Sequence, residues 1–552
     1  MKKTTLAYLL ALCAALFSCA KEDLADLAGS RTARQSPAAS GPGDVVGKVT
    51  VGYQGWFAAT GDGSPINAWW HWTQNWSQAP SPTNSGIKSW PDVREYTATF
   101  PTAFANLGNG QPARLFSSYT TQTVNTQFLW MQQHEIDVAA LQRFNPTGGE
   151  GPVRDAITSK VRTAAEAYGR KFYIMYDVSG WQNMQAEIKT DWTTKMQAYT
   201  ASGAYARQNG KPVVCIWGFG FNDSNHPWSA ATCLEVINWF KGQGCYVIGG
   251  VPTHWRNERE DSRPDFLATY KAFNMLSPWM VGRIGNVQDS DNFYANVNVP
   301  DQAYCNANGI DYQPCVLPGD LQERQRAHGD FMWRQFYNMV RAGCQGIYIS
   351  MFDEYNEGNQ IAKTAETGAM VPAGSGFWAL DEDGTPCSAD YYLRLTRDGG
   401  RMLKGQLGLT ATRPTPPVVG GSNPSSVPFG QTITLKGANN QYVSSENGTQ
   451  PMQCNRAVAQ GWEQFTVVNA GGGKVALLTQ GKYVCSENGT QPINCNRTAI
   501  GPWEQFDWIS NADGTVSLRG SNGRFVSSEG GTQAMTCTRT VAQQNESFRI
   551  NN

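Results

Sequence analysis

Three carboxylates stand within five residues of one another in the second half of the chain: Asp353, Glu354 and Glu357. They directly follow the strand-like run Gly346–Met351, which is apolar enough to be buried on both faces. Like charges held this close raise the pKa of at least one group. Hydrolysis of a glycosidic bond requires one protonated and one ionised carboxyl. The alternative interpretation is a solvated acidic loop or a helix N-cap cluster.

Acidic groups directly after a strand are typical of a (β/α)8 barrel, where reacting side chains lie on the loops that follow the strands. Between residues 47 and 409, strand-like and helix-like segments alternate, which predicts an α/β fold of the TIM-barrel type. An open doubly wound sheet is the alternative, although no glycine-rich phosphate loop follows the first strand. We expect strands at Val49–Tyr53, Ala113–Ser117, Ile136–Gln142, Lys171–Tyr176, Val213–Trp217, Cys245–Val251, Met275–Val281 and Gly346–Met351. The expected helices include Pro152–Tyr168, Trp192–Gln208, Ser229–Lys241 and Leu321–Arg341.

The acidic segment resembles the signature of glycoside hydrolase family 99. In that family Ser-Phe-Asn-Glu-Trp-His-Glu-Gly-Thr-Gln-Ile follows a strand, and here the run from Met351 to Ile361 keeps both Glu, the Phe, the Gly and the Gln-Ile. Over about residues 45–405 the chain is similar to the family 71/99 group, and family 71 has a similar acidic segment. Further similar stretches are Gly52–Phe57, His71-Trp72, Ile136–Phe144 and Gly249–Trp255.

The resemblance implies a retaining glycoside hydrolase of an unusual kind. Glu354 would act as base on the 2-hydroxyl of the sugar and give a 1,2-anhydro intermediate. Glu357 would protonate the leaving oxygen and then activate water. The sequence departs from the family at Tyr355 and Asn356, where Trp-His is usual. Because those positions adjoin the sugar, the substrate stays open between α-mannan, a xylose- or arabinose-type glycan and another glycan.

Side chains near the expected strand ends, together with those in the similar stretches, are candidates for contact with the sugar. Packing is the competing interpretation for each of them, and for Asp353 the competing role is bracing of its own loop. With five His in the chain and no paired spacing, we expect no metal site and no cofactor. The substrate-binding candidates are Tyr53, His71, Trp72, Tyr176, Asp177, His254, Trp255, Tyr355 and Asn356.

The C-terminal region, residues 428–552, contains three repeats with a period of 41 and then 42 residues, which begin near Tyr442, Tyr483 and Phe525. Threefold repetition of short strands with Asn-Gly turns predicts an all-β β-trefoil, and the pattern resembles fascin-like trefoils. Recurring shallow sites suit a carbohydrate-binding module, because weak sites gain avidity on a polymer. Turn building and protein binding are the alternatives. The glycan-binding candidates are Asn447, Gln450, Asn488, Gln491 and Gln533.

The N-terminus predicts export. Residues 1–18 combine two lysines with a short apolar run and lead into Cys19, which resembles a bacterial lipoprotein signal. We expect lipidation of Cys19, a flexible tether over 19–46, and attachment to the outer membrane on its cell-surface or periplasmic side. A soluble secreted protein is the alternative. A second Pro-, Gly- and Ser-rich segment, 410–427, predicts an interdomain linker.

The overall composition limits the classes of partner that we expect this protein to bind. The net charge is -1, so neither nucleic acid nor an anionic surface is expected, and we expect a monomer. Few charges and many Trp suit a neutral polar ligand such as a polysaccharide. Among the 13 Cys, Cys305 and Cys315 share one loop and are candidates for a disulfide. A non-catalytic glycan-binding lipoprotein is the main alternative to an enzyme; a carbohydrate esterase is disfavoured because no Gly-x-Ser-x-Gly elbow is present.

Overall fold

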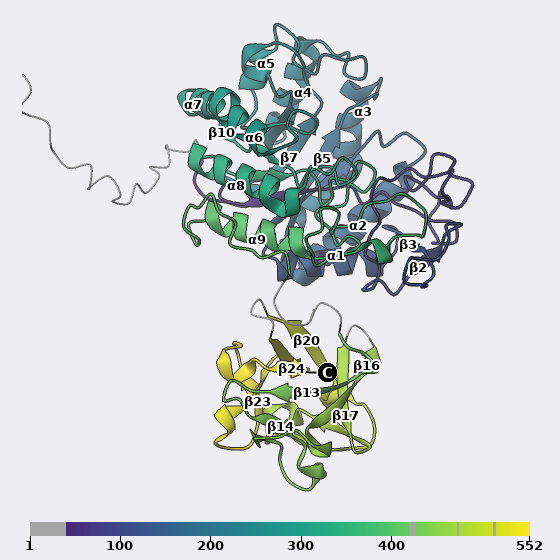
Figure 1. Ribbon diagram of the computed structural model, residues 1–552. Helices are drawn as coiled ribbons and strands as arrows, with labels where there is room; N and C mark the ends of the chain where they lie inside the picture. Colours follow the sequence, from purple (N-terminus) through teal and green to yellow (C-terminus); the bar gives the residue numbers. More distant parts are fainter. Residues whose placement is uncertain (1–39, 419–426, 472–473, 512–514, 552) are drawn as a thin grey trace, which may run out of the picture.

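A computed structural model describes residues 40–418, 427–471, 474–511 and 515–551. The predicted signal peptide, Cys19 and most of the tether lie outside these residues. The described chain forms a unit with a parallel sheet and nine labelled helices, followed by an all-β unit (Figure 1).

The parallel sheet has the strand order β10-β9-β8-β7-β5-β4-β1-β12-β11. Its two ends, β10 and β11, are parts of one short stretch and are separated only by Gln313 and Pro314. The sheet is consistent with a TIM-like barrel, and β1, β4 and β8 are buried along their whole length, as expected for strands covered on both faces. The strands are β1 (Val49–Tyr53), β4 (Val138–Arg143), β5 (Lys171–Asp177), β7 (Lys211–Trp217), β8 (Tyr246–Val251), β9 (Met275–Pro278), β10 (Asp311–Tyr312), β11 (Cys315–Val316) and β12 (Ile347–Ile349), with β6 (Arg207–Gln208) pairing antiparallel to β7.

One predicted barrel strand is corrected by the structure. Ala113–Ser117 contains β3 (Arg114–Phe116), which pairs antiparallel with β2 (Thr99–Pro101) in a separate two-stranded sheet. The parallel sheet instead includes β10 and β11. The sequence did not reveal them because Pro314 interrupts the stretch and removes a backbone donor. The other seven predicted strands overlap β1, β4, β5, β7, β8, β9 and β12.

Local sequence explains several helix ends. The side chains of Thr120 and Ser229 cap α1 and α4 by accepting a backbone N–H, and α2 ends at Gly169 in the left-handed conformation. The predicted helix Trp192–Gln208 is corrected: a π turn and a 3-10 turn span 192–201, and β6 follows. The helices are α1 (Thr121–Gln133), α2 (Gly151–Tyr168), α3 (Met184–Asp191), α4 (Ala230–Gly242), α5 (Leu267–Lys271), α6 (Val287–Phe293), α7 (Val299–Asn308), α8 (Asp330–Ala342) and α9 (Tyr391–Leu403).

A single hydrophobic core joins the parallel sheet to its helices. Helix α8 illustrates the packing, because Phe331, Phe336 and Met339 recur at helical spacing and are all buried. Each such side chain contributes roughly 1.5–3 kcal/mol on burial. This core fixes the strand ends that carry the acidic segment.

The C-terminal unit repeats the same antiparallel pairs three times: β14 with β15, β18 with β19, and β22 with β23. Equivalent positions supply its core, where Cys454, Cys495 and Cys537 are buried. The unit is therefore all-β with threefold internal repetition. Its strands are β13 (Thr432–Lys436), β14 (Tyr442–Ser444), β15 (Gln453–Arg456), β16 (Gln464–Gly471), β17 (Lys474–Thr479), β18 (Lys482–Cys485), β19 (Asn494–Arg497), β20 (Phe506–Ser510), β21 (Val516–Gly520), β22 (Phe525–Ser527), β23 (Thr536–Arg539) and β24 (Arg549–Asn551).

The structure corrects the predicted disulfide and describes parts of the predicted tether and linker. Cys305 and Cys315 are free, buried thiols rather than a disulfide, and burial raises the pKa of Cys315 to about 12. Parts of the predicted tether and linker also contact the barrel unit. The Ser40 amide donates to Asp311, and the Arg394 guanidinium donates to the Pro416 carbonyl, so residues 40–46 and 410–418 pack on the barrel unit.

Candidate active site

The acidic segment projects from the carboxyl end of β12 as a short excursion that returns to its starting point. The Phe352 amide donates to the Gly52 carbonyl of β1 at 2.8 Å, and the Ala362 amide donates back to the Phe352 carbonyl at 2.9 Å. Because both ends are tied to the same strand end, residues 353–358 are held at the mouth of the parallel sheet. This is the edge at which barrel enzymes carry their reacting groups.

Asp353 clamps the loop after β1 to the acidic segment. Its two carboxylate oxygens accept the backbone N–H groups of Gln54 and Gly55, each at 2.8 Å. The side chain is fully buried, and burial raises its pKa to about 6 against the effect of those two hydrogen bonds. A carboxylate used in this way positions Gln54 and is not free to react.

Glu354 is buried beside Gln54. The Gln54 Nε2 donates to Glu354 Oε2 at 2.5 Å, and both residues are only 5% exposed. Burial, and then the charge of Glu357, raise the pKa of Glu354 well above its usual value, while the Gln54 hydrogen bond opposes the rise. Glu354 therefore has the electrostatic character of a carboxyl that holds or exchanges a proton near neutral pH.

Glu357 lies on the solvent side of the same segment. Its side chain is exposed, yet the surrounding protein atoms still raise the pKa of its carboxyl group by desolvation. Lys88 lowers this pKa and Asp320 raises it, and those two residues form an ion pair at 2.7 Å. Since the charge of Glu357 acts on Glu354, the two glutamates form one electrostatic unit with an inner and an outer member.

The loop after β11 supports the outer glutamate. Gly358 has φ 73°, and a Cβ at this position would lie 2.7 Å from Asp320 Oδ1. The buried guanidinium of Arg326 donates to the carbonyls of Gly358 and Gln360, each at 2.8 Å. Only glycine fits at position 358, and Arg326 fixes the backbone on both sides of the turn.

Two predicted sugar-contact residues are brought together. The Asn356 side chain donates to the carbonyls of His71 and Gly86, at 2.8 and 3.1 Å. The His71 ring stacks on Trp56 with centroids 3.8 Å apart and lies 3.7 Å from Glu150. Burial lowers the pKa of His71, so its ring is neutral near pH 7. These residues form the side of the site that the loop after β1 contributes.

Five predicted sugar-contact residues lie in the core instead. All five are almost completely buried, and each polar atom has a protein partner: for example, the Tyr53 hydroxyl donates to Gln127, and the Tyr355 hydroxyl donates to the Lys363 carbonyl. They have no exposed surface in this structure and pack beneath the site, and the direct sugar contact expected for them stays a prediction. They are Tyr53, Trp72, Tyr176, Trp255 and Tyr355.

The remaining candidates lie at the end of β5 and on the loop after β8. Asp177 is 8% exposed and accepts the Ser179 amide at 2.9 Å, and burial raises its pKa. The Ser179 hydroxyl is also 2.9 Å from His226 Nε2, so this chain of contacts ties two loops together. His254 pairs with Asp261 at 2.9 Å. Both candidates are held by neighbouring loops at the same end of the sheet as Glu354.

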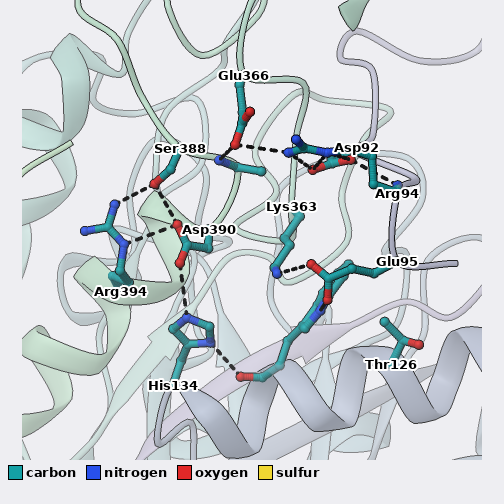
Figure 2. Close-up of polar contacts among 12 residues, drawn as sticks. Asp92, Arg94, Glu95, Thr126, His134, Lys363, Glu366, Ser388, Asp390 and Arg394 are labelled. Carbon is teal, nitrogen blue, oxygen red and sulfur yellow. Dashed lines mark hydrogen bonds and ion pairs between the residues drawn. The ribbon is translucent and has the colours of Figure 1, made fainter. Parts of the chain in front are cut away.

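A polar network holds the segment that follows the acidic residues (Figure 2). Lys363 contacts Glu95, and Arg94 pairs with Asp92 at 2.6 Å and with Glu366 at 3.0 Å. The network joins the long loop after β1 to the segment that ends the acidic excursion. It continues to the start of α9 through His134, Ser388, Asp390 and Arg394.

The residues nominated in the all-β unit sit at loop tips. Asn447 and Asn488 have φ 51° and 52°, and the following glycines approach the carbonyls of Cys495 and Cys537 in the next repeat. The Asn-Gly part of each loop therefore builds the contact between repeats. Gln450, Gln491 and Gln533 are exposed.

Four residues that organise the acidic pair were not singled out from the sequence: Gln54, Lys88, Asp320 and Arg326. Gln54 lies within the stretch Gly52–Phe57 that carried part of the family resemblance, which was the one available signal. Within the described ranges, no group of three or more His, Cys, Asp or Glu has a geometry that would hold a metal ion. No helix among the same residues has the length and apolar character needed to cross a membrane.

Comparison with known proteins gives structural matches only. No protein-family model matches the sequence, and no curated protein matches it. The GH99 endo-α-mannosidase from Bacteroides thetaiotaomicron is similar in two structures, at 16% and 15% identity and a TM-score of 0.48 in both. These cover 66% and 65% of this chain and 98% of that enzyme. The designed threefold-symmetric protein ThreeFoil matches at 15% identity and a TM-score of 0.21, covering 22% of this chain and 98% of its own.

Proposed function

We propose that the protein is a retaining glycoside hydrolase in which Glu354 and Glu357 form the acid/base pair. The observation that carries the proposal is their arrangement at the carboxyl end of β12. One carboxyl is buried and accepts a hydrogen bond from Gln54, the other faces solvent, and the charge of Glu357 raises the pKa of Glu354. We also propose that the parallel sheet is a complete (β/α)8 barrel, closed through the stretch that contains β10 and β11.

In the proposed first step, Glu354 takes the proton of the 2-hydroxyl while the 2-oxygen bonds to the anomeric carbon. The glycosidic C–O bond breaks, and Glu357 gives its proton to the leaving oxygen. In the second step, Glu357 removes a proton from water, whose oxygen bonds to the anomeric carbon. The 1,2-anhydro ring opens, and Glu354 returns the proton to the 2-oxygen. Two displacements at one carbon leave the anomeric configuration unchanged.

The surroundings of the two glutamates favour the proton on Glu354, because Glu354 is the more deeply buried acid and Lys88 lowers the pKa of Glu357. The proposed roles need the opposite distribution. A sugar 2-hydroxyl that donates to Glu354 would stabilise its carboxylate, and the sugar would cover Glu357 from water. Both effects move the single proton toward Glu357.

The proposed sugar contacts are the polar groups at the mouth of the sheet: His71, Asn356, Asp177 and His254. The exchange of Trp-His for Tyr355-Asn356 is compatible with a substrate other than α-mannan, and a xylose- or arabinose-type glycan stays open. The family 71 part of the resemblance remains a prediction.

The rest of the chain suits an enzyme that works on an extracellular polymer. We propose that residues 428–552 form a β-trefoil that binds glycan through its exposed loop tips, with protein binding as the other outcome to be tested. We also propose lipidation at Cys19 and attachment to the outer membrane. Radiolabelled palmitate incorporation into the wild type and into Cys19→Ser tests the anchor: label in the wild type alone supports it, and label in neither contradicts it.

The catalytic proposal is tested by incubating wild type, Glu357→Gln and the control Glu166→Gln with yeast α-mannan, arabinoxylan and arabinan. Glu166 is an exposed glutamate of α2, so its replacement changes charge away from the pair. We expect new reducing ends from wild type and Glu166→Gln, and a loss of at least about a hundredfold for Glu357→Gln. Retention of a polysaccharide by wild type without cleavage would instead identify a glycan-binding protein.

A further inference from the structure

A cavity lies in the loop between the acidic segment and α9. It has a volume of about 360 Å³ and is formed by residues 368–382. The side chains that matter are Phe377, Trp378, Asp381 and Glu382, and backbone groups of 371–376 complete the wall. The volume lies within the usual range of small-ligand sites, and none of these residues belongs to the acid pair.

The two neighbouring aromatic residues of this loop face opposite ways. Phe377 packs inward against Trp90 and Phe104, with ring centroids 5.9 and 5.8 Å apart. Trp378 is 41% exposed and lines the cavity. Phe377 thus anchors the loop, while Trp378 presents an indole ring to the cavity and to water.

Arg324 fixes that indole from one side. The guanidinium carbon is 5.0 Å from the Trp378 ring centroid. Its Nε pairs with Glu382 at 2.6 Å, and its Nη2 donates to the Glu382 carbonyl at 2.9 Å. One face of the ring is therefore held by a locked arginine, which leaves the rest of the exposed indole surface available to a flat, apolar partner.

Polar groups beside the ring match sugar hydroxyls. Asp381 lines the same cavity and is only partly buried, and backbone N–H groups of Asp381 and Gly368 lower the pKa of its carboxyl against the effect of burial. The carboxylate can also accept hydrogen bonds from hydroxyl groups. An aromatic surface with an adjacent acceptor binds a ring that has C–H faces and hydroxyl edges, and the carboxylate repels an anionic ligand.

A chain of polar contacts links the cavity loop to the acid pair through the loop after β11. The Gln322 side chain donates to the Gly376 carbonyl at 3.2 Å, and its backbone amide donates to Asp320 at 2.8 Å. Asp320 in turn pairs with Lys88, and both residues act on the pKa of Glu357.

From these contacts we propose that the cavity is a subsite for one neutral sugar unit of the polymer, with Trp378 as its stacking surface and Asp381 as its acceptor. This inference rests on the proposed function only for the class of ligand. The subsite holds a unit beyond the bond that Glu354 and Glu357 cleave, so it favours long chains over short ones.

The binding test uses full-length Glu357→Gln protein labelled with 5-fluorotryptophan. The resonance missing from an added Trp378→Phe variant is assigned to Trp378, and Trp503, an exposed residue of the all-β unit, is assigned in the same way as a control. Mannotetraose, xylotetraose and arabinotetraose are titrated separately. We expect one of them to move the Trp378 resonance. The affinity of that tetrasaccharide, measured from the same resonance, should fall at least about tenfold in Asp381→Asn. If none of the three moves it, the subsite proposal is overturned.

A kinetic test separates this proposal from the catalytic one. Trp378→Ala should raise KM on the cleaved polysaccharide about tenfold and leave kcat nearly unchanged, because the ring binds the ground and transition states alike. Trp378→Phe should restore most of the affinity. Cleavage by wild type with no change in KM for Trp378→Ala rejects the subsite alone. A shifted Trp378 resonance in a protein that cleaves nothing rejects the hydrolase proposal and keeps the subsite.

Discussion

Replacing Gln54 with Met should lower kcat/KM at acidic and neutral pH and leave it nearly unchanged at alkaline pH. The Gln54 amide donates a hydrogen bond to the Glu354 carboxylate at 2.5 Å, and it lowers a pKa that burial and Glu357 raise. Met has nearly the volume of Gln but no donor. The ionised form of Glu354, which the proposed mechanism needs as the base, then loses its partner and is populated only at higher pH.

The size of the effect follows from the burial of both groups. Each side chain is 5% exposed, so water does not replace the lost donor. A hydrogen bond to a charged group contributes about 1.5–3 kcal/mol, which corresponds to roughly a ten- to hundredfold loss of kcat/KM on the acidic side. Folding stability should change little, because Gln54 Oε1 is buried with no partner among the described residues and its removal offsets the lost bond.

The assay is kcat/KM on the cleaved polysaccharide over roughly pH 4 to 9, which reports the ionisations of the free enzyme. Gln132→Met is the matched control, because Gln132 is an exposed residue of α1 whose amide bonds only the Tyr168 carbonyl. A Gln54→Met profile that equals the wild type at acidic pH, or one that falls equally at every pH, refutes the electrostatic role of Gln54.

Three further variants test separate parts of the structure. Lys88→Met removes the charge that lowers the pKa of Glu357, so the alkaline limb, set by the acid, should move to higher pH; a shift to lower pH contradicts this. Asp353→Asn leaves one of two buried N–H groups without an acceptor and should cost about 1–3 kcal/mol in urea unfolding, where an unchanged midpoint disproves the clamp. Gly489→Ala places a Cβ 2.5 Å from the Cys537 carbonyl and should destabilise the all-β unit. The control Gly471→Ala meets open space, so it carries only the conformational cost of roughly 1–2 kcal/mol and should destabilise the unit less. Equal melting temperatures of the two variants would exclude the repeat contact.

The sequence predicted the acidic segment and the strand before it because both are local features: a continuous apolar run and three carboxylates. The residues that tune the pair are distant in sequence. Gln54 is 300 residues from Glu354, and Lys88 is 232 residues from Asp320. No periodicity within a segment indicates such contacts, which arise only when the parallel sheet brings its first and last strands side by side.

The geometry of the strand ends also explains why the sequence did not predict the complete burial of several aromatic candidates. Successive side chains of a strand point to opposite sides, so an uncertainty of one residue decides between the mouth of the sheet and its packed interior. Tyr176 is fully buried, whereas Asp177, the next residue, keeps some exposure. The same limit applied to β3, since an apolar run of strand length does not reveal which partner it pairs with.

The most direct measurement of the central claim follows hydrolysis of the cleaved polysaccharide by ¹H NMR before mutarotation, with wild type, Glu354→Gln and Glu357→Gln side by side. We predict that the first product of the wild-type enzyme keeps the anomeric configuration of the bond that was broken, and that both variants release none in the same time. An inverted first product, or release by either variant at the wild-type rate, would contradict the assignment of these two glutamates.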